Sequence, residues 1–262
     1  MKKISLSPIS LIIKDAKKGK IFILVDNKNR ENEGDLVIPA SKANSKSINF
    51  MAKHGRGLIC LALTKKKVDK LSLPLMSAIN KARMQTAFTV SIEAKKGITT
   101  GISAFDRART IKVAINHNSK KKDIVSPGHV FPLVARSGGV LERAGHTEAS
   151  VDISKLAKLN PSAVICEVMN EDGRMARLDD LLKFAQKHNL KIASIEDLIS
   201  YRLKNEKFMF NFSNKKIKIK KIGSFNLNIY KNKLDGLEHY VLSRGKFNIR
   251  KSVRVRVISV NV

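Results

Sequence analysis

The sequence predicts an α+β fold, a twisted mixed β-sheet covered by helices on both faces and followed by a small β-rich appendage. Helix and strand patterns alternate along residues 1–202, without the regular spacing of a doubly wound fold. After Arg202 the pattern changes to the apolar alternation of strands. Hydrophobic residues make up 43% of the 262 residues, which is enough to form a buried core. We therefore expect two parts, residues 1–202 and 203–262.

The first elements surround a charged loop. A helix is predicted over residues 7–18, because Ser-Pro is a typical start and Gly follows its lysine-rich last turn. The apolar run 21–25 predicts a short buried strand, and 36–39 predicts a second one. Residues 26–35, between the two strands, are polar and charged and contain one Gly, so we expect a loop there.

The later elements follow from the same rules. The predicted helices span 45–54, 103–117, 178–189 and 194–201, and the predicted strands span 57–63, 88–93, 163–169 and 192–193. Ser103 with Asp106 three residues later resembles a capping box, and Ser194 is a second predicted cap. Beyond residue 203, residues 216–220 and 253–257 alternate as strands do, and no helix signal remains.

The formal net charge of +29 is typical of proteins that bind nucleic acid or acidic membranes. The excess consists mostly of Lys and is scattered along the chain, so we favour a solvated, lysine-coated surface and expect no nucleic-acid partner. Nucleic-acid binding stays open as the main alternative, and it predicts an affinity that falls steeply with salt. It gives no reason for the acids of the first loop.

The cysteines and the apolar runs indicate a location. Cys60 and Cys166 each lie inside an apolar strand-like run, which predicts buried thiols in a reducing compartment rather than disulfides. No apolar run approaches the length needed to cross a membrane. The start of the chain shows no signal-peptide cleavage pattern. We expect a cytoplasmic protein with no membrane partner.

The first candidate site is the loop 30–35, with Glu31, Glu33 and Asp35 beside Arg30. Three carboxylates this close repel one another unless a cation lies among them, so a divalent metal is a natural interpretation. A solvated acidic turn is the alternative, and spacing alone does not decide between them.

The second candidate site is the segment 143–148, which reads RAGHTE. Thr147 can cap a helix that begins there, so the free N–H groups of that helix and Arg143 could hold a phosphate. His146 and Glu148 would face the same opening. An ordinary histidine at a helix start is the alternative for His146, and its charged neighbours make that alternative weaker.

Two isolated residues complete the candidates. His129 lies between two prolines, in a rigid turn, and could act as a general acid or base. A loop histidine bonded to backbone is equally compatible with this segment. Glu167 interrupts an apolar strand, so it must be paired, bound to metal or placed at a strand end facing a site.

Together these segments resemble the 3,4-dihydroxy-2-butanone 4-phosphate synthase family, in the family's order and over essentially all of residues 1–202. Besides Asp26, the matching blocks are 30–35 (RENEGD), 86–90 (TAFTV), 97–101 (GITTG), 127–132 (PGHVFP), 138–141 (GGVL) and 145–149 (GHTEA). The resemblance implies conversion of D-ribulose 5-phosphate to L-3,4-dihydroxy-2-butanone 4-phosphate and formate. It also implies a three-layer fold, a homodimer, and Mg²⁺ or Mn²⁺ with two ions per active site.

The family's motif assigns roles to matching positions. It implies metal ligands at Glu31 and His146; catalytic roles for His129, Glu167, Asp35 and Glu33; and substrate contacts at Arg30, Glu31, Asp35, Arg143, Ala144, Gly145, His146, Thr147 and Glu167. Asp26, Thr110 and Glu148 match positions that line the same site. One departure concerns the loop 80–85, where Met84 stands in a place expected to carry an aromatic residue or His.

The tail resembles the opening strands of GTP cyclohydrolase II, through residues 225–245 and 253–257. That family's zinc-binding cysteines have no counterpart, because no Cys follows Cys166. We therefore expect residues 203–262 to be a degenerate or truncated segment without zinc-dependent GTP ring opening.

Overall fold

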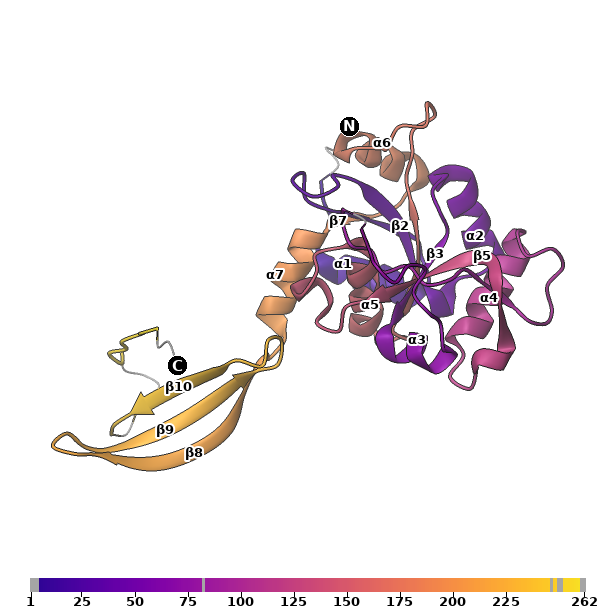
Figure 1. The fold of residues 1–262 in the computed structure, drawn as a ribbon. Coiled ribbons are helices and arrows are strands. Elements are labelled where there is room, and N and C mark those ends of the chain that lie inside the picture. The colour runs from indigo at the N-terminus through magenta and orange to yellow at the C-terminus, as the bar shows by residue number, and fades with distance from the viewer. Residues whose placement is uncertain (1–4, 82, 246, 249–251, 260–262) are drawn as a thin grey trace. The chain divides into compact units, whose positions relative to one another are not determined.

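The computed structural model describes residues 5–81, 83–245, 247–248 and 252–259. The chain forms two compact units, one ending at Asn205 and one beginning at Glu206 (Figure 1). The boundary lies three residues beyond the predicted one, because the last helix of the first unit, α7 (Ile195–Asn205), runs on past Tyr201.

The first unit is built on one seven-stranded sheet of order β4-β5-β3-β6-β2-β1-β7. Pairs β1/β7 and β3/β5 are parallel and the other pairs are antiparallel, so the predicted mixed sheet is confirmed. The strands are β1 (Phe22–Val25), β2 (Gly34–Pro39), β3 (Cys60–Thr64), β4 (Ile92–Ala94), β5 (Ile124–Ala135), β6 (Ser162–Glu167) and β7 (Ile192–Ser194).

Helices cover both faces, which gives three layers (Figure 1). Helices α1 (Ile9–Lys18), α5 (His146–Leu156) and α7 pack on one face, and α2 (Ser45–Phe50), α3 (Lys65–Leu71), α4 (Ala104–Ile115) and α6 (Leu178–His188) pack on the other. Successive side chains of a strand point to opposite faces of the sheet, so the core has two halves. Val37 packs toward α5, while its neighbours Leu36 and Ile38 pack toward the opposite layer.

Local capping explains where several helices begin. The Ser103 hydroxyl accepts the N–H of Asp106 at 3.0 Å, and the Ser194 hydroxyl accepts the N–H of Asp197 at 3.0 Å, as predicted. The predicted Ser-Pro start of α1 is wrong in detail, because Pro8 is the N-cap and the Ser7 N–H donates to Ile192 O of β7 at 2.6 Å.

The structure differs from the predictions in four places. Helix α3 and strand β5 were not predicted, and residues 51–55 continue α2 as a π-helical turn. Of the strand predicted over 88–93, only the end belongs to a regular strand, β4. The register between β4 and β5 shifts there, from Ile92↔Val130 to Glu93↔Val125. Residues 126–129 of β5 therefore bulge out of the ladder.

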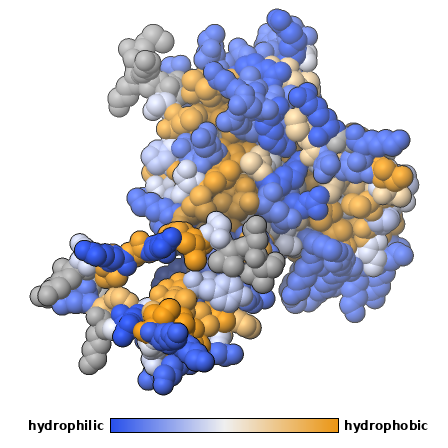
Figure 2. Space-filling view, turned by 60° about the vertical axis from the view of Figure 1, so that its left-hand side comes forward, coloured by the Kyte–Doolittle hydropathy of each residue, from blue (hydrophilic) through white to orange (hydrophobic). Residues whose placement is uncertain are grey.

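The second unit is a three-stranded antiparallel sheet of β8 (Met209–Ile219), β9 (Gly223–Asn232) and β10 (Glu238–Ser243), so the predicted strand content is confirmed. Residues 253–257 form no strand. Apolar side chains of this unit remain in contact with solvent, including Leu237 at 60% exposed. Figure 2 shows hydrophobic residues interspersed with hydrophilic ones on the visible surface.

Both cysteines are buried free thiols, as predicted. None of the helices in the described ranges is long and apolar enough to cross a bilayer.

Replacing Leu61 by Ala tests the core of the first unit. Leu61 is fully buried in β3, which pairs on both sides with β5 and β6. The cavity and lost burial should lower the free energy of unfolding by about 2–5 kcal/mol. The chain lacks Trp, so urea unfolding is followed by circular dichroism. The matched control is Ile79→Ala, at a side chain that is 71% exposed, which should change stability by less than about 0.5 kcal/mol. Equal losses in both variants would contradict this core.

Candidate active site

The acidic loop after β1 is organised by the carboxylate of Asp26, which is only 9% exposed. Asp26 Oδ2 accepts from Arg30 Nη1 at 2.8 Å and from the Glu31 N–H at 3.0 Å. Its Oδ1 accepts from the Glu33 N–H at 2.8 Å. One buried carboxylate thus fixes the backbone from which the acids project. The resemblance placed Asp26 at the site but gave no indication of this role.

A second residue holds the same loop from outside. Arg177, the N-cap residue of α6, donates through Nη1 to the carbonyls of Glu31 at 2.8 Å and Asn32 at 2.6 Å. Its guanidinium also lies 3.8 Å from a carboxylate oxygen of Glu33. Arg177 was not predicted, because nothing near it in the sequence indicates a partner about 145 residues away.

Asp35 lies in β2 rather than in the predicted loop, because the β1–β2 hairpin pairs Val25 with Gly34. It stands directly opposite Glu167 at the end of β6. Residues paired in this way point to the same face, so both carboxylates lie on the side of the sheet that α5 covers. Of the alternatives left open for Glu167, which were pairing, metal binding or a strand end that faces a site, the structure places it at the end of β6.

The carboxylate of Glu167 is held in place by the chain before β3. Its Oε2 accepts from the Leu58 N–H at 2.8 Å. Gly57 makes this approach possible, since a Cβ there would lie 2.5 Å from the same oxygen. Neither residue was predicted to contribute to the site.

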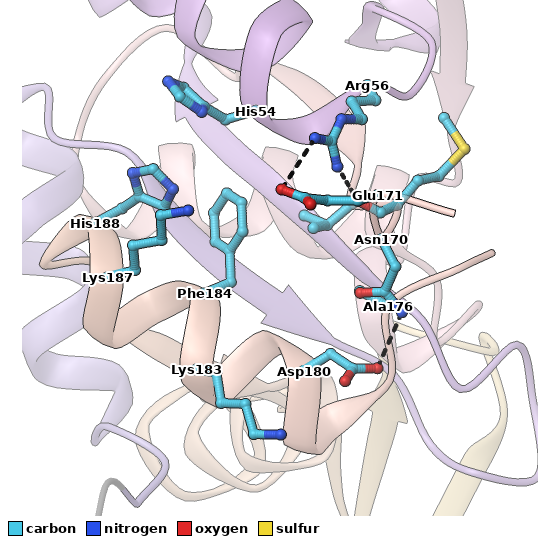
Figure 3. Close-up of a pocket in the computed structure, with 12 residues that line it drawn as sticks. His54, Arg56, Asn170, Glu171, Ala176, Asp180, Lys183, Phe184, Lys187 and His188 are labelled. Carbon is cyan, nitrogen blue, oxygen red and sulfur yellow. Dashed lines mark hydrogen bonds and ion pairs between the residues drawn. The ribbon is translucent and has the colours of Figure 1, made fainter. Parts of the chain in front are cut away.

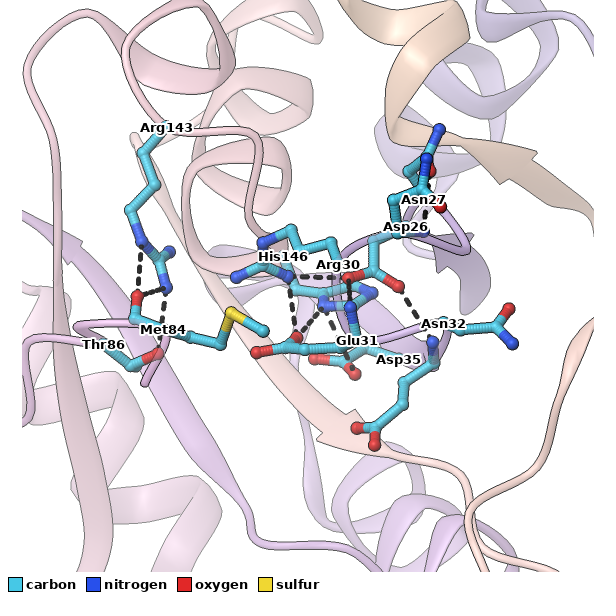
Figure 4. Close-up of polar contacts among 12 residues, drawn as sticks. Asp26, Asn27, Arg30, Glu31, Asn32, Asp35, Met84, Thr86, Arg143 and His146 are labelled. Carbon is cyan, nitrogen blue, oxygen red and sulfur yellow. Dashed lines mark hydrogen bonds and ion pairs between the residues drawn. The ribbon is translucent and has the colours of Figure 1, made fainter. Parts of the chain in front are cut away.

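His146 is the first residue of α5 and is buried beneath the acidic loop. Its Nδ1 lies 3.6 Å from Glu31 Oε2 and 3.9 Å from Asp35 Oδ1, as Figure 4 shows. These separations are too long for hydrogen bonds. Ligand atoms of Asp26, Glu31 and His146 all lie within 4.8 Å of one another. The two regions that the sequence marked separately therefore form one cluster.

The cluster fits a divalent cation. Three buried side-chain atoms in the described ranges lack a hydrogen-bond partner, and two of them are Asp35 Oδ1 and His146 Nε2. Buried polar atoms are rarely left in this state. Carboxylate oxygens suit Mg²⁺ and Mn²⁺, and an added imidazole suits Mn²⁺ better.

The pKa values of the cluster reflect both its burial and its several carboxylates. Burial raises the pKa of Asp35, and the charge of Glu167 adds to this effect. Burial opposes protonation of His146, but the charges of Asp35 and Glu31 outweigh it and raise the pKa of His146. Interaction with His146, helped by Arg30, lowers the pKa of Glu31 to about 2. A cation among these carboxylates is therefore favoured, either the protonated His146 or a bound divalent ion that replaces its proton.

The start of α5 differs from the prediction. Thr147 does not cap the helix, because the N-cap is Gly145 and Thr147 lies buried in the first turn. A side chain at position 145 would displace the Arg143–Glu148 ion pair, since a Cβ would lie 2.2 Å from Arg143 Nη1 and 2.9 Å from Glu148 Oε2. Ala144 beside it is exposed.

Arg143 contacts the loop 80–85 in this structure. It forms an ion pair with Glu148 at 2.6 Å and donates to Met84 O at 3.0 Å and to Thr86 Oγ1 at 2.9 Å. Figure 4 shows the Met84 side chain extending from this contact toward Glu31. Position 82 of the loop lies outside the described residues. Arg143 thus ties the divergent loop to the start of α5.

His129 lies in the bulged part of β5, not in a free turn, and its side chain is 43% exposed. Its Nδ1 contacts the carboxylate of Glu93 on β4. Gly101 leaves room for this pair, since a Cβ there would lie 2.7 Å from His129 Nδ1. The loop containing Gly101 is fixed by Asp106, which accepts from the N–H groups of Thr99 and Gly101, both at 3.1 Å.

The structure does not bring every predicted residue together. Strand β5 is separated from β2 by β3 and β6, so the β5 backbone lies roughly 14 Å from β2 at about 4.8 Å per strand. His129 is thus apart from Asp35 within one chain. Thr110 is fully buried, and its hydroxyl accepts the Ala94 N–H at 3.0 Å, which is a packing contact between α4 and β4.

A separate hollow of about 410 Å³ lies between the π-helical turn and α6 (Figure 3). The rings of His54 and His188 meet there at a tilt of 52°, with centroids 4.7 Å apart, next to Phe184. Its wall includes Val168, which packs into the core on the face opposite α5. None of the predicted site residues lines it, so it is not the candidate active site.

The fold and the site define a mixed-sheet protein with a carboxylate–histidine cluster suited to a divalent cation. Residues 10–201 match the family model described as 3,4-dihydroxy-2-butanone 4-phosphate synthase, and the chain belongs to this family. The predicted resemblance is therefore confirmed.

Several relatives show the same similarity. The riboflavin biosynthesis protein RibBA of Aquifex aeolicus is 53% identical over 94% of this chain and 61% of its own length. The 3,4-dihydroxy-2-butanone 4-phosphate synthase of Neisseria meningitidis serogroup A is 49% identical over 96% of this chain and 69% of its own length. The chain thus spans less than two thirds of the first relative and slightly more of the second.

Solved structures agree with the fold. The two-domain synthase RibBX from A. baumannii superposes with a TM-score of 0.81 at 47% identity, covering 91% of this chain and 70% of its own. A synthase crystallised in complex with two magnesium ions gives a TM-score of 0.73 at 38% identity, covering 76% of this chain and 98% of its own.

Metal binding tests the cluster directly. Saturating Mg²⁺ or Mn²⁺ should raise the melting temperature, because an ion at 100 times its Kd stabilises the folded state by about 2.7 kcal/mol. Glu31→Gln should remove most of this shift, measured by differential scanning calorimetry. The control is Glu171→Gln, at a side chain that is 88% exposed, which should retain the shift. A Glu31→Gln protein that responds fully to the ion would rule out Glu31 as a ligand.

Proposed function

We propose that the chain converts D-ribulose 5-phosphate to L-3,4-dihydroxy-2-butanone 4-phosphate and formate in riboflavin biosynthesis. The observation that carries the proposal is the convergence of Glu31, Asp35 and His146 in one buried cluster. The names of the relatives support the same reaction. The family model ends at residue 201, so the proposal assigns the activity to residues 1–202.

The proposal includes Mg²⁺ as the metal, with two ions per site and Mn²⁺ as the alternative. Glu31 and His146 would hold it, and Asp35 borders the same space. A related synthase crystallised with two magnesium ions supports the metal and its number. When bound, the metal stabilises negative charge on adjacent substrate oxygens.

The protein's own groups then have distinct tasks. The reaction removes a proton beside a ketone, stabilises an enediolate, expels water and rearranges the carbon skeleton. We assign the proton transfers to the carboxylates of Asp35, Glu33 and Glu167. Burial raises the pKa of Asp35 and of Glu33. The high pKa of a buried carboxyl lets it act as an acid or a base near neutral pH.

The start of α5 is the proposed phosphate contact. Gly145, His146 and Thr147 form the first turn, where backbone N–H groups and the helix dipole favour an anion. Arg143 and Arg30 add positive charge beside it. In this arrangement Arg143 exchanges its bonds to the loop 80–85 for bonds to the phosphate, which couples substrate binding to the position of Met84.

His129 is proposed to act from a second copy of the chain. It is exposed and lies several strands away from Asp35, so it does not complete the cluster within one chain. A homodimer that places the His129 of one protomer against the acidic cluster of its partner would restore the predicted group of residues. The separation of His129 from Asp35 within one chain is thus a physical reason to expect the homodimer that the resemblance implies.

The remaining parts of the proposal concern location and partners. Both cysteines are unpaired buried thiols, which supports a reducing compartment such as the cytoplasm. The substrate is a small sugar phosphate, and the reaction requires no nucleic acid or membrane partner.

A formate assay tests the reaction. The chain should release formate from D-ribulose 5-phosphate when Mg²⁺ is present, and EDTA should abolish the release until Mg²⁺ is restored. Coupled formate dehydrogenase provides the measurement. GTP should yield no formate, which separates this activity from GTP ring opening. Formate release that persists unchanged in EDTA would refute the metal-dependent mechanism.

Replacing Glu93 tests the role of His129. Glu93→Gln keeps the volume but removes the charge that orients the imidazole, so kcat should fall about 10- to 100-fold with little change in KM. The control is Glu196→Gln, an exposed acid in the first turn of α7, which should leave kcat unchanged. An unaltered kcat and pH profile in Glu93→Gln would show that the pair has no part in the reaction.

A further inference from the structure

A large basic hollow lies away from the acidic cluster, and nothing in the proposed reaction uses it. It is open to solvent and has a volume of about 940 Å³. Its lining residues come from α3, the segment after β4, α4 and the turn before β5: Lys70, Lys95, Lys96, Arg109, Val113, Asn116, Asn118, Ser119, Lys120, Lys122 and Asp123. We propose that this hollow binds a compact polyphosphate anion.

The first argument is the concentration of charge. Six of the eleven lining residues are Lys or Arg, whereas these two types make up 51 of 262 residues in the chain. Asp123 is the one acid among the lining residues, and its carboxylate accepts the Lys120 N–H at 2.8 Å. The hollow is therefore much more basic than the Lys-rich composition alone would give.

The second argument is that these cations lack acidic partners, although Lys70 Nζ donates to the backbone carbonyl of His117. No ion pair involves any of the six within the part of the chain that the structure describes. Like charges gathered in one concave site repel one another, and the concave shape strengthens the field. Burial, with Lys70 nearby, also lowers the pKa of the adjacent Lys67. A multiply charged anion relieves this repulsion.

The third argument is that the walls are tied together. The Lys95 N–H donates to Asp123 O at 3.0 Å, which joins the segment after β4 to the turn before β5. Lys67 Nζ donates to Asn116 O at 2.5 Å, which joins α3 to the end of α4. These two contacts hold the segments that carry the charges in a fixed arrangement.

The lining chemistry selects the class of ligand. None of the lining residues is aromatic, so the hollow has no surface on which a base could stack. Asn118 and Ser119 add neutral hydrogen-bonding groups that suit phosphate oxygens. The site is a hollow rather than an extended stripe. These features favour several linked phosphoryl groups over a nucleic acid strand.

The hollow is distinct from the candidate active site. Helices α3 and α4 pack on the face of the sheet opposite α5, whose first residue is His146. A connection exists through residues 95–101, because the Arg109 side chain lies 3.1 Å from the position of a Cβ at Gly97. The same segment ends at Gly101, beside His129. The proposal concerns binding and does not depend on the proposed reaction.

The test uses the full chain and tripolyphosphate as the probe. Isothermal titration at low salt, in buffer containing EDTA so that metal chelation gives no heat, should show binding with a Kd below about 1 mM. The double variant Lys95→Gln/Lys96→Gln should bind at least about tenfold more weakly, because it loses charge-assisted contacts. The affinity of the unaltered chain should also fall as salt rises.

The matched control is Lys14→Gln/Lys17→Gln, which removes the same charge from α1 on the other face of the sheet. It should change the affinity by less than about twofold, since exposed charges beyond a Debye length of about 10 Å are screened. Circular dichroism confirms that both variants fold. Equal weakening by both pairs, or no binding by the unaltered chain, would overturn the proposal. So would tighter binding of single-stranded RNA that Lys95→Gln/Lys96→Gln abolishes.

Discussion

The antiparallel register between β2 and β6 is the constraint on which the site depends. It places Asp35 directly opposite Glu167 and turns both carboxylates toward α5. A slip of β2 by one residue would turn Asp35 to the other face, away from Glu167, and would also exchange the layers in which Leu36 and Val37 pack. The hydrophobic pattern that stabilises the sheet therefore also fixes the position of the site.

Two buried aspartates organise the loops at either side of the sheet. Asp26 holds the acidic loop through Arg30 and two backbone N–H groups. Asp106 holds the loop beside His129 in the same manner, and hydrogen bonding from the Thr99 hydroxyl lowers the pKa of Asp106. A carboxylate that accepts hydrogen bonds from backbone N–H groups holds a loop in one defined conformation. Both loops can thus present side chains without being helices or strands.

The charges of the chain are unevenly distributed. The overall charge is +29, yet the acidic loop and Asp35 gather negative charge around His146. A cation is favoured at that cluster, while the surrounding surface favours anions. An enzyme acting on a sugar phosphate benefits from both, since the ligand carries negative charge and the metal binds its oxygens. The basic hollow beside α4 is part of the surface that favours anions.

The sequence by itself determined most of the fold and which side chains form the candidate site. Apolar periodicity gave the mixed sheet and the helices on both faces, because burial imposes that pattern locally. Acid density in 30–35 and the motif around His146 marked the site. The sequence could not show that Asp35 belongs to a strand or that Gly145 rather than Thr147 begins α5. Nor could it show that Arg177 holds the acidic loop and that Glu93 contacts His129. Those features depend on register and on contacts between distant segments, which only the tertiary structure decides.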